Sequence, residues 1–202
     1  MSFAIFNPDK MPTAYYVADY ISCGQHTGNL LQLPMCANSD WKIQLKFQMQ
    51  AYGGGAFFGY CGNDDSGIQY RFFGYSGQWY FDLNSISYRL CGGTISTDTI
   101  YNFEMANRYV KNLDTGNYIL GSASTSKAPS FSSEAQLQLF GEDGYGKCYS
   151  IKAYMNNVLK YDFVPAINTR GLVGLYDKVN SKFYGRGTGL KVGQLTGEII
   201  YE

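Results

Sequence analysis

Residues 41–50 read WKIQLKFQMQ, and this stretch decides the fold class. Apolar side chains occupy every odd-numbered position and polar side chains every even-numbered one. A period of two predicts a long β-strand with one buried and one hydrated face, because successive side chains of a strand point to opposite sides of a sheet. The predicted buried face consists of Trp41, Ile43, Leu45, Phe47 and Met49, and the predicted exposed face includes Lys42, Gln44 and Lys46.

Shorter alternating runs occupy much of the remaining chain, at residues 68–72, 79–83, 101–105, 136–139 and 149–153. Turn-forming residues separate them, at 53–55, 64–67, 76–77, 114–117 and 141–144. Asn156-Asn157 is predicted to form a two-residue hairpin turn, because asparagine tolerates a positive φ. Roughly a dozen short strands, with no long run of helical period, are typical of an all-β antiparallel sandwich of two sheets.

The composition indicates one globular domain. The chain has 202 residues, of which 45% are hydrophobic, so it can bury a sizeable core. Sixteen basic residues balance sixteen acidic ones without clusters, which argues against nucleic acid as a partner. No apolar run reaches the ~18 residues of a membrane-spanning helix, and residues 1–12 lack the pattern of a signal peptide. These patterns predict a soluble protein made in a reducing cytoplasm.

The cysteines are odd in number and scattered along the chain. They are Cys23, Cys36, Cys61, Cys91 and Cys148. A zinc site needs closely spaced pairs of ligands, and a secreted disulfide framework usually has an even count. All five are therefore predicted to be reduced thiols, most of them small core residues.

Two segments near the C-terminus carry a family resemblance. Residues 148–166 read CYSIKAYMNNVLKYDFVPA, and residues 171–189 read GLVGLYDKVNSKFYGRGTG. The segment KYDFVPA at 160–166, followed by GLYD at 174–177, VN at 179–180 and FY at 183–184, resembles the closing part of concanavalin A-like, laminin-G-type domains. Asp19–Ile21 and Thr27-Gly28 resemble the opening of that family more loosely. Such domains are common in tailed-phage structural proteins and in gut-bacterial surface proteins.

The resemblance implies a jelly-roll version of the two-sheet sandwich. The residues themselves suggest where one strand stops, since a proline lacks the N–H that a sheet needs and constrains the residue before it. Asp162 and Phe163 are thus predicted to end a strand before Pro165. We predict two parts in the chain: an N-terminal docking segment, 1–13, which is apolar but short, and a jelly-roll domain, 14–202.

Catalytic motifs are hard to find. His26 is the single histidine, and no Gly-x-Ser-x-Gly motif accompanies it. Glucanases of the same fold use a Glu-x-Asp-x-x-Glu strand to place acids beside the scissile bond, and that spacing does not occur in this sequence. The protein is predicted not to be an enzyme, and His26 is predicted to lie in a loop or at a strand end.

A carbohydrate site is the binding site that the resemblance implies most directly. Sugars stack on aromatic rings and exchange hydrogen bonds with amides and carboxylates. The candidate rings stand beside glycine or polar residues: Tyr52, Tyr75, Trp79 and Tyr145. Core packing is the alternative for each.

Asn63, Asp64 and Asp65 could bind calcium through their oxygens, although the same residues also suit an ordinary turn. No other metal or cofactor is predicted.

Three functions remain open on these grounds. The first is a non-enzymatic virion accessory protein of a phage, such as a head fibre, capsid decoration or tail-associated adhesin, assembled in the host cytoplasm. It would bind glycans and other virion proteins and form a homo-oligomer, since many weak contacts on one particle add up to high avidity. The second is a purely structural virion building block, and the third is a bacterial glycan-binding or glycoside-active surface protein.

Overall fold

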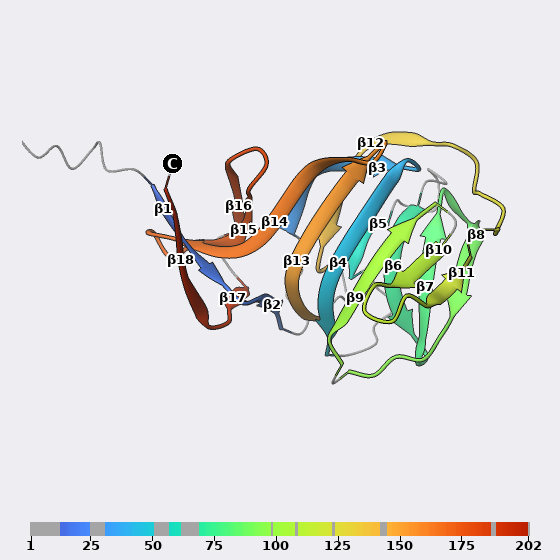
Figure 1. The fold of residues 1–202 in the computed structure, drawn as a ribbon, viewed down its shortest axis with the longest axis horizontal. Helices are drawn as coiled ribbons and strands as arrows, with labels where there is room; N and C mark the ends of the chain where they lie inside the picture. The colour runs from blue at the N-terminus through green and yellow to red at the C-terminus, as the bar shows by residue number, and fades with distance from the viewer. Residues whose placement is uncertain are drawn as a thin grey trace, which may run out of the picture.

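A computed structural model describes residues 13–24, 31–50, 57–61, 69–97, 99–107, 109–122, 124–141, 145–186 and 189–201. Within these residues the chain forms antiparallel strands and no helix, and two sheets face each other (Figure 1). The predicted all-β, two-sheet antiparallel sandwich is confirmed. Of the predicted docking segment, only Thr13 belongs to the described residues.

The larger sheet has twelve strands. Eight of them follow one another in the order β11 (Tyr118–Gly121), β10 (Tyr109–Asn112), β9 (Tyr101–Ala106), β4 (Trp41–Met49), β13 (Gly146–Met155), β14 (Val158–Asn168), β1 (Ala14–Ala18) and β18 (Leu195–Tyr201). The other four branch from this path in two pairs. β15 (Val173–Asp177) pairs with β14, and β16 (Lys182–Arg186) pairs with β15. β2 (Ile21–Cys23) pairs with β13, and β17 (Leu190–Val192) pairs with β2.

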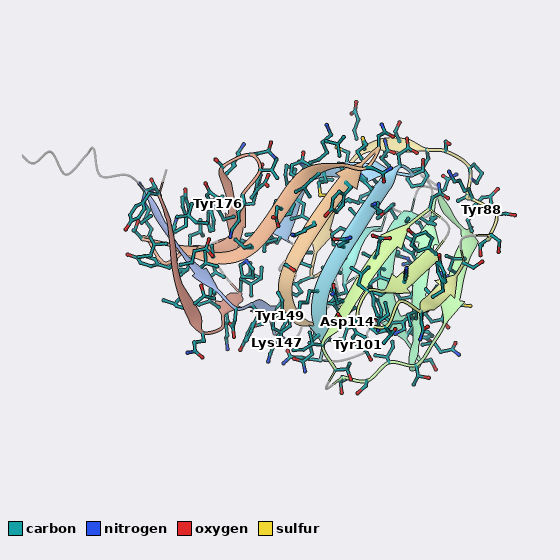
Figure 2. All side chains as sticks on the ribbon, viewed as in Figure 1. Tyr88, Tyr101, Asp114, Lys147, Tyr149 and Tyr176 are labelled. Atoms are coloured by element: carbon teal, nitrogen blue, oxygen red, sulfur yellow. The ribbon has the colours of Figure 1, made fainter. Side chains whose placement is uncertain are left out.

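The smaller sheet has six strands and covers one face of the larger sheet. Its order is β3 (Leu31–Asn38), β12 (Ser132–Leu139), β5 (Phe58–Cys61), β6 (Gln69–Tyr75), β7 (Gln78–Leu83) and β8 (Ser85–Gly92). The core lies between the two sheets and is rich in aromatic rings (Figure 2).

β4 has the predicted inward face. Its five apolar side chains are each at most 7% exposed, and Phe47 lies within 5.0–5.6 Å of the rings of Phe57 and Phe72. The polar face differs in part from the prediction, since Lys46 is exposed but Lys42 and Gln44 are half-buried. These two side chains are partly covered because Lys42 donates a hydrogen bond to Asn157 in the β13–β14 turn and Gln44 donates one to Glu104 of β9.

The β13–β14 hairpin turns at the predicted dipeptide. Asn156 and Asn157 have φ angles of 52° and 61°, which are the left-handed values that a two-residue hairpin turn requires. The strands then pair from Met155–Val158 to Ile151–Phe163, with one shift of register between Tyr154 and Ala153. The turn prediction is therefore confirmed, and the reason is local: asparagine adopts this backbone conformation more readily than most residues.

The predicted strand end before Pro165 is wrong, because β14 continues to Asn168. Pairing with β13 stops at Phe163, and pairing with β1 starts at Ala166. Pro165 lies in the gap between these two partners and faces Leu175 of β15 on its other side. The missing N–H thus removes no hydrogen bond to β13 or β1, which is why a proline is tolerated inside this strand.

The second half of β14 leaves the sandwich and enters an extension that we call the wing. The wing consists of β18, β1, residues 164–168 of β14, β15 and β16 (Figure 1). A small cluster of its own holds it together, in which the ring of Tyr15 lies 5.0 Å from the rings of both Tyr176 and Phe183. β18 forms its outer edge and pairs with β1 alone among the described strands.

The outer face of the smaller sheet carries one buried carboxylate. Asp82 is 0% exposed, and the Nε atoms of Arg71 and Arg89 both donate to it at 2.6 Å. The two guanidinium groups also lie over aromatic rings, Arg71 at 4.7 Å from the centre of Phe73 and Arg89 at 5.4 Å from that of Tyr80. This arrangement joins β6, β7 and β8 on the side away from the core.

Candidate functional site

The aromatic residues that the sequence suggested for sugar binding differ in how far the structure buries them. Trp79 is 1% exposed and stacks on Phe72 at 5.1 Å in the core, so it offers no face to a ligand. Tyr145 is also buried. Tyr75 is 55% exposed at the end of β6 and points away from the core. Among these three, Tyr75 alone is accessible.

The remaining sequence candidates lie outside the described residues. These are Tyr52, the calcium candidates Asn63, Asp64 and Asp65, and His26. Among the residues that the structure does describe, no group of three or more histidine, cysteine or acidic side chains could hold a metal ion.

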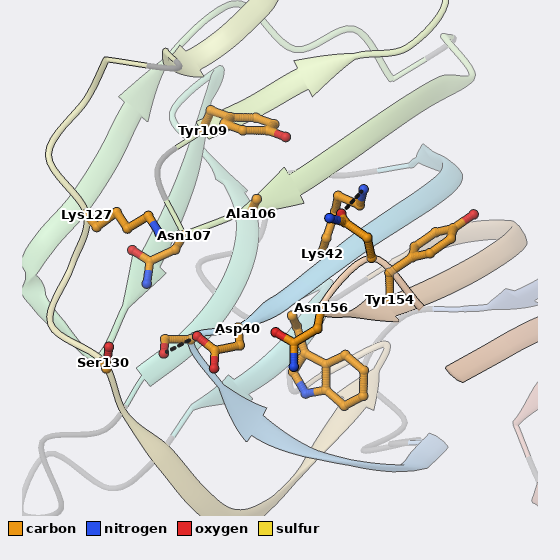
Figure 3. Close-up of a pocket in the computed structure, with 12 residues that line it drawn as sticks. Asp40, Lys42, Ala106, Asn107, Tyr109, Lys127, Ser130, Tyr154 and Asn156 are labelled. Atoms are coloured by element: carbon orange, nitrogen blue, oxygen red, sulfur yellow. Dashed lines mark hydrogen bonds between the residues drawn. The ribbon is translucent and has the colours of Figure 1, made fainter. Parts of the chain in front are cut away.

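A hollow of about 450 Å³ at one end of the sandwich is the best candidate site. Four segments that are distant in sequence surround it: the β3–β4 turn, the β9–β10 turn, residues 127–130 and the β13–β14 turn (Figure 3). Its lining is mostly polar. The residues that line it are Ser39, Asp40, Trp41, Lys42, Ala106, Asn107, Tyr109, Lys127, Ser130, Tyr154, Asn156 and Asn157.

One wall of the hollow is fixed by the β3–β4 turn. The backbone N–H of Ser39 donates to the carbonyl of Phe131 at 3.0 Å, and the N–H of Phe131 donates to Ser39 Oγ at 3.2 Å. The same hydroxyl donates to Asp40 Oδ1 at 3.3 Å, and the Asp40 N–H is bound by Asn38 Oδ1 at 2.8 Å. Asp40 is thus held in place, and its second carboxylate oxygen accepts no hydrogen bond from the described residues.

The opposite wall contains two tyrosines on the outer face of the larger sheet. Lys42 Nζ lies 5.1 Å from the ring centre of Tyr154 and donates to Asn157 Oδ1 at 3.2 Å. Tyr109 donates from its hydroxyl to Glu104 at 2.7 Å. Figure 3 shows these two rings on separate strands beside the hollow.

The two tyrosines are connected by side chains between them. Gln44 donates to Glu104 at 3.0 Å and accepts from the Tyr154 hydroxyl at 3.4 Å. The chain of hydrogen bonds from Tyr109 through Glu104 and Gln44 to Tyr154 therefore crosses four strands. Side chains held in this way lose little conformational entropy when a ligand binds.

Asn107 has an unsatisfied polar atom. Its Oδ1 is buried and has no hydrogen-bond partner among the described residues. An acceptor buried without a donor costs about 1–3 kcal/mol, so such an atom calls for an explanation. In Figure 3 its amide lies on the Lys127 side of the hollow, across from Asn156. A ligand with an N–H or O–H group would satisfy it.

The sequence signal for this site was present in part. The Asn156-Asn157 turn was predicted for its backbone, but its two amides also line the hollow. Tyr109 and Tyr154 alternate with core residues in the same way as many other tyrosines in the chain, so nothing local distinguishes them. The site becomes visible only when the sheets bring its four segments together.

Comparison of the chain with protein-family models, with curated proteins and with solved structures found no match. Among the described residues no helix is long and apolar enough to cross a membrane.

Proposed function

We propose that this chain is a non-enzymatic glycan-binding accessory protein of a phage virion, with a concanavalin A-like jelly-roll fold. The hollow beside Asp40, Asn107 and Asn156 carries the binding part of this proposal. It combines a carboxylate, three amides and two lysines with two tyrosine rings, which includes the mixture of groups that sugar sites use. Its volume of about 450 Å³ falls in the ordinary range of ligand sites.

The virion context rests on the sequence resemblance of residues 148–166 and 171–189. In the structure the first segment lies in the β13–β14 hairpin and the second contains the β15–β16 hairpin. The first hairpin contributes Tyr154, Asn156 and Asn157 to the hollow. A virion carries many copies of such proteins. Modest affinity per copy then suffices, because linked sites raise the overall avidity by orders of magnitude.

Glycan-array binding of Tyr154→Ala tests the hollow directly. We expect the variant to lose about tenfold in affinity for the glycans that the unchanged protein binds, equivalent to about 1.4 kcal/mol, because a stacking ring is removed. Tyr75→Ala is the matched control, since Tyr75 is an exposed tyrosine on the other sheet. Loss of binding in Tyr75→Ala with unchanged binding in Tyr154→Ala would place the site elsewhere, and an array without any bound glycan would refute glycan binding.

A second candidate function, a structural building block, is favoured by the edge strand β18. Leu195, Ile199 and Tyr201 are between 43% and 65% exposed there. The one charged side chain of the strand, Glu198, is paired with Lys178 at 2.8 Å. We infer that this edge pairs with the same edge of a second copy, because an antiparallel pair of identical edges needs no other partner and meets no unpaired charge.

Light scattering of Ile199→Lys measures whether β18 makes such a pair. We expect the unchanged protein to form a dimer or larger oligomer and the variant to be monomeric with an unchanged melting temperature, since a lysine on an edge strand opposes pairing with another strand. Lys191→Ala is a control on a strand away from this edge. Equal masses for the protein and both variants would exclude the β18 edge as the contact.

A further inference from the structure

A second, smaller cavity adjoins the candidate site at Asn107. It has a volume of about 90 Å³ and shares Asn107 with the hollow. Leu83, Leu90 and Ala128 give it apolar walls, and Tyr88, Arg89 and Ser126 complete its lining. Residues 126–128 line both spaces. Lys127 lines the hollow, and its neighbours Ser126 and Ala128 line the small cavity. Asn107 therefore stands where a polar space meets a largely apolar one.

The unsatisfied Oδ1 of Asn107 determines which chemical group a ligand should place between the hollow and the small cavity. Oδ1 can only accept, so the ligand must bring an N–H or O–H donor. A hydroxyl would supply the donor but would leave the apolar cavity empty. An ammonium group would supply the donor too, but it would carry its charge toward Leu83, Leu90 and Ala128, where a charge is poorly solvated, and toward the like charge of Arg89.

An acetamido group meets both requirements. Its N–H is a neutral donor, and its methyl group lies two bonds beyond the nitrogen, which suits a small apolar space behind the acceptor. We propose that the hollow binds sugars that carry an N-acetylated amino group, with the amide N–H on Asn107 Oδ1 and the methyl group in the cavity of Leu83, Leu90 and Ala128. This inference rests on the glycan-binding function proposed above and names the class of sugar.

Ligand-observed NMR and calorimetry on the full chain test this specificity. The probes are the methyl glycosides of N-acetylglucosamine and N-acetylgalactosamine, the parent hexosides glucoside and galactoside, and the corresponding free amines. We expect at least one acetylated sugar to bind about tenfold more tightly than both its parent hexoside and its amine, which is the usual effect of filling a small apolar pocket. Equal affinity of all three forms would overturn the inference.

Two variants separate a role in recognition from a role in folding. Asn107→Leu removes the acceptor while keeping a side chain of similar size, and removing an unsatisfied buried atom should leave the melting temperature unchanged or raise it. We expect this variant to lose the preference for the acetylated sugar. Ala128→Leu fills the cavity and should abolish the same preference while leaving the weaker hexoside binding in place. Retention of the full preference in both variants would contradict the inference.

The outcomes also distinguish this inference from the function on which it rests. If hexosides bind at the hollow, with loss in Tyr154→Ala, but acetylation makes no difference, the glycan-binding function stands and the acetamido specificity fails. If none of the sugars binds and the glycan array is empty as well, both fail together.

Discussion

Replacing Phe47 with alanine should lower the free energy of unfolding by about 3–5 kcal/mol. The side chain is 0% exposed and lies at the centre of the aromatic core. Besides Phe57 and Phe72, its ring lies 5.6 Å from the rings of Trp79, Tyr101 and Phe103. Alanine removes the buried area of the ring and leaves a cavity that rigid neighbouring rings cannot close, and both effects destabilise the fold.

Urea unfolding followed by tryptophan fluorescence measures this loss, since Trp79 is itself a neighbour of Phe47. Lys46→Ala is the matched control on the adjacent, exposed position of β4 and should change the stability by no more than about 0.5 kcal/mol. A loss below about 1 kcal/mol in Phe47→Ala would mean that the inward face of β4 has been assigned to the wrong side.

Replacing Asp82 with alanine should cost about 2–4 kcal/mol. Removing one member of a fully buried ion pair costs about 3–5 kcal/mol, because the other charge is left without compensation. Here the side chains of Arg71 and Arg89 are 16% and 33% exposed, so water can solvate them in part and the expected cost is smaller. The hydrogen bond from Arg89 to Asp82 also raises the pKa of the guanidinium. The variant loses this effect, but an arginine stays charged at neutral pH without it, so both guanidinium groups keep their charge.

The same unfolding measurement applies, with Lys178→Ala as the control. The pair of Lys178 and Glu198 is exposed at both ends and should contribute at most about 1 kcal/mol. Comparable small losses in Asp82→Ala and Lys178→Ala would show that the buried carboxylate contributes no more to stability than a surface ion pair.

The fold class could be predicted from the sequence because its signals are local. Alternation over residues 41–49 identifies a strand and its buried face, and Asn156-Asn157 identifies a turn, without reference to any distant residue. The failure at Pro165 has the opposite cause. Whether a proline ends a strand depends on which neighbours that strand has at that point. Here pairing with β13 has already stopped at Phe163, and the next partner, β1, is far away in sequence.

The candidate site could not be predicted for a related reason. The alternation of apolar and polar residues indicates that Trp79 and Tyr154 each lie on one face of a strand. It does not indicate which face the second sheet covers. Trp79 proved to be core, and Tyr154 proved to lie beside the hollow. The hollow itself depends on the crossovers that place β9, β4 and β13 side by side, which no local pattern encodes.

β14 also determines how the molecule carries mechanical load. The strand is continuous from the turn at Asn157, beside the hollow, to Asn168 in the wing. If the wing is anchored and a ligand in the hollow is pulled, the tension runs along the axis of this strand. The covalent backbone of β14 then carries the load from the hollow to the wing, and the hydrogen bonds that join β14 to β13 do not have to break. The hairpin that lines the hollow is therefore tied to the wing by covalent bonds.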